Sequence, residues 1–144
     1  RNNLVTKSAA RVRLDKNGVV TVETDMTDIG TGTYTILAQI TAETLGVPLE
    51  QVKVEIGDSD FPPAPGSGGQ FGAATAGSAA LGAGMELRKA LAELATGDPR
   101  SPLYGEDPTL VDFANGNIAL ANKTETLAAA DAFLVSLGYL PAKK

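Results

Sequence analysis

Residues 62–78 read PPAPGSGGQFGAATAGS, and the rest of the chain is organised around this glycine-rich stretch. Its prolines and glycines predict a tight loop, and the run of small residues that follows predicts a helix. Such a loop places free backbone N–H groups at a helix N-terminus, where the peptide dipoles favour an anion. Glycine also lets a ligand approach the backbone, because no Cβ stands in the way. A flexible linker has a similar composition, so an anion-binding loop and a linker both remain open at this point.

The composition indicates a single domain over residues 1–144. Hydrophobic residues make up 43% of the chain, which is enough for a core and argues against disorder. The net charge of −5, with no basic stripe to offset it, argues against nucleic acid as a partner. The sequence shows no signal peptide and no apolar run of the ~20 residues that a membrane span needs. We therefore expect a cytoplasmic or periplasmic protein without membrane contact.

The chain contains no cysteine and no histidine. Without cysteine it can form no disulfide and offers no thiolate to a metal or an iron–sulfur cluster. Without histidine it lacks the commonest general base and the usual zinc ligand. Asp58 and Asp60 are candidate metal ligands, but two acidic residues in a turn are more often solvated or cap backbone amides. We expect neither a catalytic residue nor a metal site within this chain.

The residue pattern predicts an α/β (α+β) fold with two β-hairpins, a β-α-β crossover and three helices. Residues 9–14 and 19–24 alternate in polarity around Asn-Gly, the strongest short hairpin signal. A helix is expected over 33–45 and a strand over 51–56, and this order favours parallel strands joined by a crossover. The apolar stripe of the helix is expected to contain Tyr34, Leu37, Ile40, Thr41 and Leu45.

The second half of the chain predicts a long helix from residue 74 to about residue 95. Glycines in its first half each cost about 1 kcal/mol relative to alanine, so we expect a ligand or another backbone to approach them closely. A loop excursion follows over 96–108, then an Asn-Gly hairpin of residues 110–113 and 117–120, and a last helix over 124–137. The apolar pattern of the long helix contains Met85, Leu87, Leu91 and Leu94.

A second glycine turn, DMTDIGTG at residues 25–32, lies just ahead of the first predicted helix. Gly30 and Gly32 either turn the chain or let a ligand approach, and the residues alone do not separate the two roles. If both helices point their N-termini into one crevice, the two glycine turns would form a split anion site.

Both turns carry a family resemblance. Residues 24–36 (TDMTDIGTGTYTI) with Ala38-Gln39, followed by residues 64–73 (APGSGGQFGA), resemble the molybdenum-binding subunit of the xanthine dehydrogenase/aldehyde oxidase family. The bacterial aldehyde oxidoreductase branch is the most similar. The resemblance runs from about Ala9 to Leu137, and it has two ordered motifs at matching separation.

The resemblance implies a molybdoenzyme that oxidises aldehydes or related heterocycles with a molybdenum–molybdopterin cofactor, with or without an appended cytosine dinucleotide. It implies that Gly30 and Thr31 of the first turn contact the pyranopterin phosphate region. Many relatives have glutamine at the position of Thr31, whereas the bacterial aldehyde branch accepts threonine. In the second turn, the implied phosphate contacts come from Gly69, Gln70, Phe71 and Gly72.

The family's catalytic glutamate, in a glycine-rich Gly-Glu motif near the end of the full subunit, has no counterpart in these 144 residues. The resemblance therefore implies part of a cofactor-binding domain that is not catalytic alone. Its implied partners are the rest of the molybdenum subunit and the iron–sulfur and FAD subunits, and self-association would cover exposed strand edges. The alternative is a small phosphate- or nucleotide-binding domain, or a purely structural domain, derived from that family.

Overall fold

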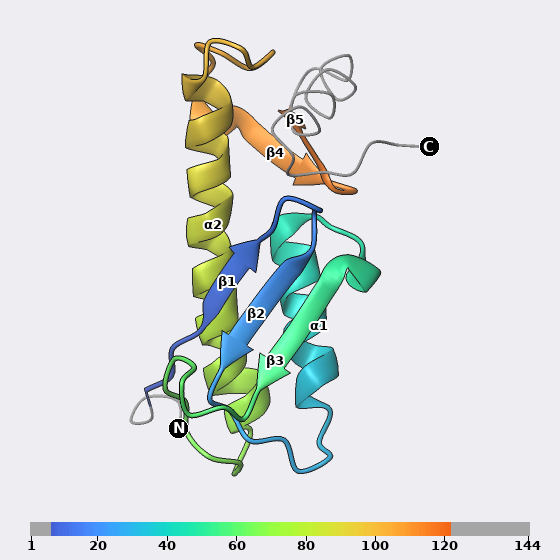
Figure 1. The fold of residues 1–144 in the computed structure, drawn as a ribbon, viewed down its shortest axis with the longest axis vertical. Coiled ribbons are helices and arrows are strands. Elements are labelled where there is room, and N and C mark those ends of the chain that lie inside the picture. The colour runs from blue at the N-terminus through green and yellow to red at the C-terminus, as the bar shows by residue number, and fades with distance from the viewer. Residues whose placement is uncertain (1–6, 122–144) are drawn as a thin grey trace.

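The computed structural model describes residues 7–121, and Figure 1 shows how their elements are arranged. Among these residues, no helix is both long and apolar enough to cross a membrane. The elements are β1 (Arg11–Leu14), β2 (Val20–Thr24), α1 (Thr33–Leu45), η2 (Leu49–Gln51), β3 (Val52–Ile56), the π-helical turn η3 (Phe71–Ala76), α2 (Gly77–Gly97), η4 (Pro108–Leu110), β4 (Val111–Ala114) and β5 (Asn117–Leu120).

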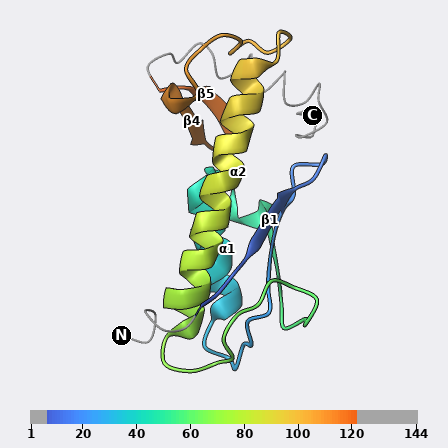
Figure 2. The same cartoon turned by 90° about the vertical axis from the view of Figure 1, so that its left-hand side faces the viewer.

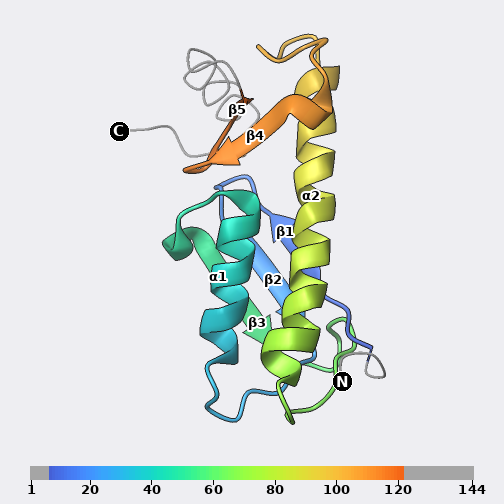
Figure 3. The same ribbon diagram turned by 180° about the vertical axis from the view of Figure 1, so that it is seen from behind.

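The first sheet confirms the predicted hairpin and crossover. Its strand order is β1-β2-β3, with β1 antiparallel and β3 parallel to β2. Figures 2 and 3 show α1 and α2 together on one face of this sheet. Val22 of β2 and Leu37 of α1 are fully buried between these layers. The alternation of the strands therefore sets which face the helices cover.

Helices α1 and α2 run side by side in the same direction (Figure 3). Small residues of α2 make this close packing possible. A Cβ added at Gly77 would lie 2.8 Å from Ile40 Cδ1, and one at Gly84 would lie 2.9 Å from Thr44 Cγ2. The expected neighbour of these glycines was a ligand or another backbone, whereas the close neighbour at these two positions is a side chain of α1. Gly82 has nothing within 4 Å of an added Cβ.

The second predicted hairpin, β4–β5, is confirmed and lies at the C-terminal ends of both helices. The Gly116 N–H donates to the Gly46 carbonyl at 2.6 Å. Arg88 of α2 donates to the Thr44 carbonyl at 3.1 Å and to Asp112 Oδ1 at 2.9 Å. Its guanidinium also lies 4.7 Å from the centre of the Phe113 ring, within cation–π range. One arginine thus connects α1, α2 and the hairpin.

Some predicted positions and boundaries are wrong. Tyr34 is 48% exposed, Met85 53% and Leu94 39%. The helix predicted from residue 74 begins with the π-helical turn at Phe71 and extends to Gly97. The loop excursion that was expected over 96–108 therefore starts later, after α2 ends at Gly97. The predicted last helix, 124–137, lies outside the described residues.

The residues that α2 buries are small, in place of the bulky residues of its apolar pattern. They are Gly77, Ala80, Gly84, Ala92, Ala95 and Thr96.

The opposite face of the first sheet contains a buried carboxylate. Glu23 is 1% exposed and accepts hydrogen bonds from Arg11 and Arg13 of β1, whose side chains are 51% and 58% exposed. Burial of Glu23 favours its protonated form, but the hydrogen bonds from the two arginines outweigh burial and lower its pKa. This ion-pair network connects the edge strand to the central strand.

We predict that Glu23→Gln lowers the free energy of unfolding by about 1 kcal/mol at neutral pH, a modest figure because both arginines are half exposed. Since the folded-state pKa of Glu23 is lowered, its stabilisation is present above the ordinary value of 4.5 and is lost as the pH falls below it. Urea unfolding of the unsubstituted protein and of Glu23→Gln should give a gap between their free energies of unfolding, and this gap should close in acid. Glu55→Gln on the same face, where Glu55 pairs with the exposed Lys53, is the control and should change stability little. A gap that persists unchanged in acid would contradict the prediction.

Two glycines of α2 allow a matched test of helix packing. Gly82→Ala should stabilise the fold by about 1 kcal/mol, because it improves helix propensity and meets no neighbour. Gly84→Ala should destabilise it by about 1–2 kcal/mol, because the new methyl group would collide with Thr44. Chemical denaturation measures both changes. Equal stabilisation by the two substitutions would show that Thr44 of α1 does not pack closely against α2 at Gly84.

Candidate functional site

The two glycine turns lie together at one end of the molecule, where α1 and η3–α2 both begin (Figure 3). A Cβ added at Gly72, in the second turn, would lie 2.8 Å from Thr33 Oγ1 at the start of α1. Thr33 is 1% exposed and has little room to move. The predicted arrangement, in which both helices point their N-termini toward one place, is therefore present.

The first turn exposes backbone rather than side chains. Gly30 has φ +88° and Gly32 φ +81°, both in the left-handed region that favours glycine. An added Cβ at either position would meet nothing within 4 Å, so the space around this turn is open. No side chain caps α1, and Ile36 N–H donates to the carbonyl of its N-cap residue, Gly32, at 3.0 Å. Thr33 is buried, whereas Tyr34 and Thr35, the next two residues of the first turn of α1, are exposed, so their amides are available to a ligand.

Asp28 occupies two amides of this turn, and the sequence analysis missed its role. Its Oδ1 accepts hydrogen bonds from Gly30 N–H at 2.9 Å and from Thr31 N–H at 3.2 Å. These are the two residues that the family resemblance assigns to phosphate contact. An aspartate two and three residues ahead of the amides is the spacing of an Asx turn, which could have revealed the contact from sequence.

The second turn is built around an unusual glutamine. Gln70 has φ +70° and is the N-cap residue of η3, where no side chain supplies a cap. The Phe71 N–H donates to the Gly68 carbonyl at 2.8 Å, and the Ala74 N–H donates to the Gln70 carbonyl at 2.8 Å. The ring of Phe71 packs against the core, whereas Gly69 and Gln70 are exposed. The exposed backbone of this turn thus lies directly at the start of η3.

Neither turn contains a cationic side chain. Residues 17–52 and 54–87 include no lysine or arginine. Among residues 7–121, no group of three or more acidic, histidine or cysteine residues could hold a metal ion. These segments can therefore offer an anion backbone amides, neutral side-chain donors such as Thr31 and Gln70, and the positive ends of two helix dipoles, but no full positive charge.

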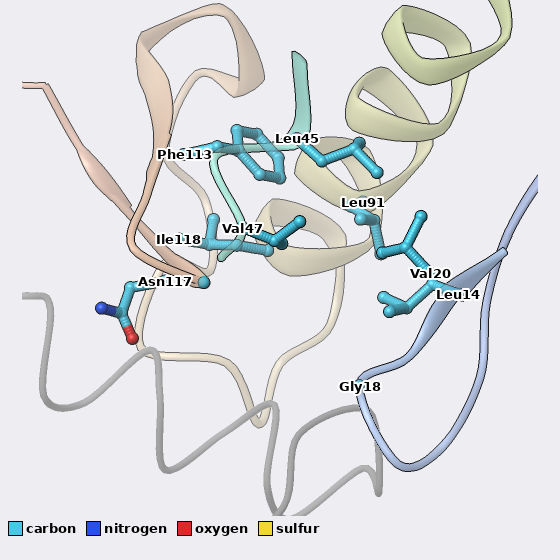
Figure 4. Close-up of a pocket in the computed structure, with 10 residues that line it drawn as sticks. Leu14, Gly18, Val20, Leu45, Val47, Leu91, Phe113, Asn117 and Ile118 are labelled. Carbon is cyan, nitrogen blue, oxygen red and sulfur yellow. The ribbon is translucent and has the colours of Figure 1, made fainter. Parts of the chain in front are cut away.

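A separate cavity lies at the other end of the molecule, between the first sheet and the second hairpin. It is lined mainly by apolar side chains, and Figure 4 shows the amide of Asn117 turned away from them. Such a lining suits core packing and offers little to a phosphate. The lining residues are Leu14, Gly18, Val20, Leu45, Val47, Leu91, Phe113, Gly116, Asn117 and Ile118.

A family model of the molybdopterin cofactor-binding domain matches residues 2–138. The chain belongs to this family. The aldehyde oxidoreductase molybdenum-binding subunit PaoC of Escherichia coli K12 is 55% identical over 127 residues, which cover 88% of this chain and 16% of that subunit. The xanthine dehydrogenase molybdenum-binding subunit of Escherichia coli O157:H7 is 37% identical over 57 residues, or 39% of this chain and 8% of that subunit. The crystal structure of quinoline 2-oxidoreductase from Pseudomonas putida 86 matches with a TM-score of 0.75 at 26% identity, over 96% of this chain and 18% of that one.

These similarities confirm the predicted fold class and the resemblance to molybdenum-binding subunits of the xanthine dehydrogenase/aldehyde oxidase family. The chain is a molybdopterin cofactor-binding domain of the aldehyde oxidoreductase family. It spans 16% of the length of PaoC. The roles assigned to Gly30, Thr31 and residues 69–72 stay predictions.

The strained backbone of Gln70 leads to a testable expectation. A left-handed conformation costs a residue other than glycine about 1–2 kcal/mol, so Gln70→Gly should raise the free energy of unfolding by about 1 kcal/mol. The same substitution at Gln39, an exposed position within α1, should lower it by about 1 kcal/mol. Thermal or urea unfolding distinguishes the two signs. Destabilisation by Gln70→Gly would mean that the glutamine side chain stabilises the fold by more than its backbone strain costs.

Proposed function

We propose that this chain supplies the two glycine turns that bind the pyranopterin phosphate in a molybdenum-dependent oxidoreductase of the aldehyde oxidoreductase type. Residues Gly30 and Thr31 of the first turn and residues 69–72 of the second line the phosphate position. The observation that carries the proposal is the close approach of Gly72 to Thr33, because it brings two helix N-termini to one place.

The residues present fit a phosphate group. The start of α1 has no side-chain cap, and neither does the start of η3. The space beside Gly30 and Gly32 is open. Amides at a helix N-terminus hydrogen-bond phosphate oxygens and place the positive end of the helix dipole against their charge. We favour the cytosine dinucleotide form of the cofactor, because two adjacent helix N-termini suit two linked phosphates.

When bound, the cofactor supplies the redox chemistry of the enzyme. The residues of this chain would bind and orient its phosphate end, and they would not take part in the oxidation of substrate. The proposed partners are the remainder of the molybdenum subunit, an iron–sulfur subunit and an FAD subunit. This assignment rests on the similarity to PaoC, of which the chain spans 16%.

A titration of the isotopically labelled chain with inorganic pyrophosphate tests the site. Amide NMR signals of Gly32, Gly69 and Gly72 should shift in a saturable manner, because their N–H groups lie at the two turns. Gly18 and Gly116, in the turns of the two hairpins, serve as internal controls and should not move. Inorganic phosphate should bind more weakly than pyrophosphate, because it can contact fewer amides at once.

The result separates the candidate functions. Saturable shifts confined to the two glycine turns support the proposed phosphate site. Equal small shifts of all five glycines would show only a salt effect and would leave a purely structural domain as the better account. Shifts centred on any other part of the chain would place the anion elsewhere and overturn the proposal.

A further inference from the structure

We propose that Asp28 decides which backbone amides bind the phosphate, so that the phosphate is displaced from Gly30 and Thr31 toward the start of α1 and Gly72. This inference rests on the proposed function, since it concerns the same site. It changes the assignment for the first turn: Gly30 and Thr31 shape the loop, and neighbouring amides donate to the ligand. By accepting hydrogen bonds from two backbone amides, Asp28 determines which of the remaining amides can donate to the ligand.

The hydrogen-bond geometry supplies the first argument. One carboxylate oxygen of Asp28 accepts from both Gly30 N–H and Thr31 N–H, at 2.9 and 3.2 Å. Each backbone amide has one hydrogen to donate. A phosphate oxygen at these amides would therefore have to break both contacts and release a charged carboxylate. No side chain caps the amides that open α1, and those of the exposed residues Tyr34 and Thr35 can donate without that loss.

Charge supplies the second argument. A carboxylate just ahead of a helix N-terminus interacts favourably with the helix dipole, in the same region where a phosphate would bind. Two anions in one place repel each other, and neither turn contains a lysine or arginine to offset that repulsion. Asp28 therefore weakens phosphate binding on its own side of the site and leaves the side formed by α1 and Gly72 as the better position.

Calorimetry with inorganic pyrophosphate at low ionic strength tests the charge argument. Asp28→Asn keeps an oxygen that can accept from both amides but removes the negative charge. It should tighten binding about fivefold, and added salt should reduce this gain. Asp15→Asn is the matched control, because Asp15 Oδ1 also accepts from two backbone amides, those of Asn17 and Val19, in the turn of the first hairpin. It removes the same charge and should leave the affinity nearly unchanged.

Amide NMR tests the geometric argument. In the unsubstituted chain, pyrophosphate should shift the signals of Tyr34, Thr35 and Gly72 more than those of Gly30 and Thr31. In Asp28→Ala, which frees the two capped amides, Gly30 and Thr31 should join the shifted set. Circular dichroism and the pattern of unshifted signals would show whether that variant keeps its fold. If it does not, the comparison of shifts within the unsubstituted chain carries the geometric test.

The failures of the two proposals are distinguishable. If the unsubstituted chain binds pyrophosphate at the turns but Asp28→Asn matches Asp15→Asn, the role of Asp28 is overturned and the site stands. Larger shifts at Gly30 and Thr31 than at Tyr34 in the unsubstituted chain would also overturn it. If none of the three proteins binds, the phosphate site itself fails, and the inference about Asp28 fails with it.

Discussion

The contact between α1 and α2 is the constraint on which the rest of the structure depends. Side chains of α1 reach the backbone of the second helix at Gly72, Gly77 and Gly84, so the two helices lie too close for larger residues there. Because they run in the same direction, this contact aligns their N-termini at one end and their C-terminal halves beside the second hairpin. Helix packing and the geometry of the candidate site therefore have a common cause.

The sequence predicted the elements that depend on local chemistry. Both hairpins follow from Asn-Gly turns between alternating strands, and Asn115 and Gly116 do take the positive φ angles that such turns need. The crossover follows from the order of strand, helix and strand, together with the stop signals at Gly46 and Pro48. Gly46 has φ +63°, as expected for a glycine that ends a helix. These signals lie within a few residues of the structure that they specify.

Most of what the sequence did not predict depends on contacts between distant segments. Periodicity placed Tyr34, Met85 and Leu94 on the apolar faces of their helices, yet all three are exposed. For Met85 and Leu94 the reason is that α2 packs through alanines and glycines instead of its largest side chains. Hydrophobic periodicity considers only bulky residues, so it gave no sign of the contact between Gly72 and Thr33. These two residues are far apart in the chain. Asp28 was overlooked for a different reason: glycine motifs direct attention to free amides, and a nearby carboxylate can occupy those amides first.

The chain is acidic, with a net charge of −5, and its candidate anion site lies in segments that contain no lysine or arginine. Under these conditions the position of the amides matters more than the overall field of the protein, since hydrogen bonds act at short range and surface charge is screened by salt. Amides of a helix N-terminus are held by the helix itself and need no reorganisation when an anion arrives. The packing of Gly72 on Thr33 then acts on binding as well as on stability, because it fixes the distance between the two sets of donors. A residue that loosened this contact would change the site without touching a ligand.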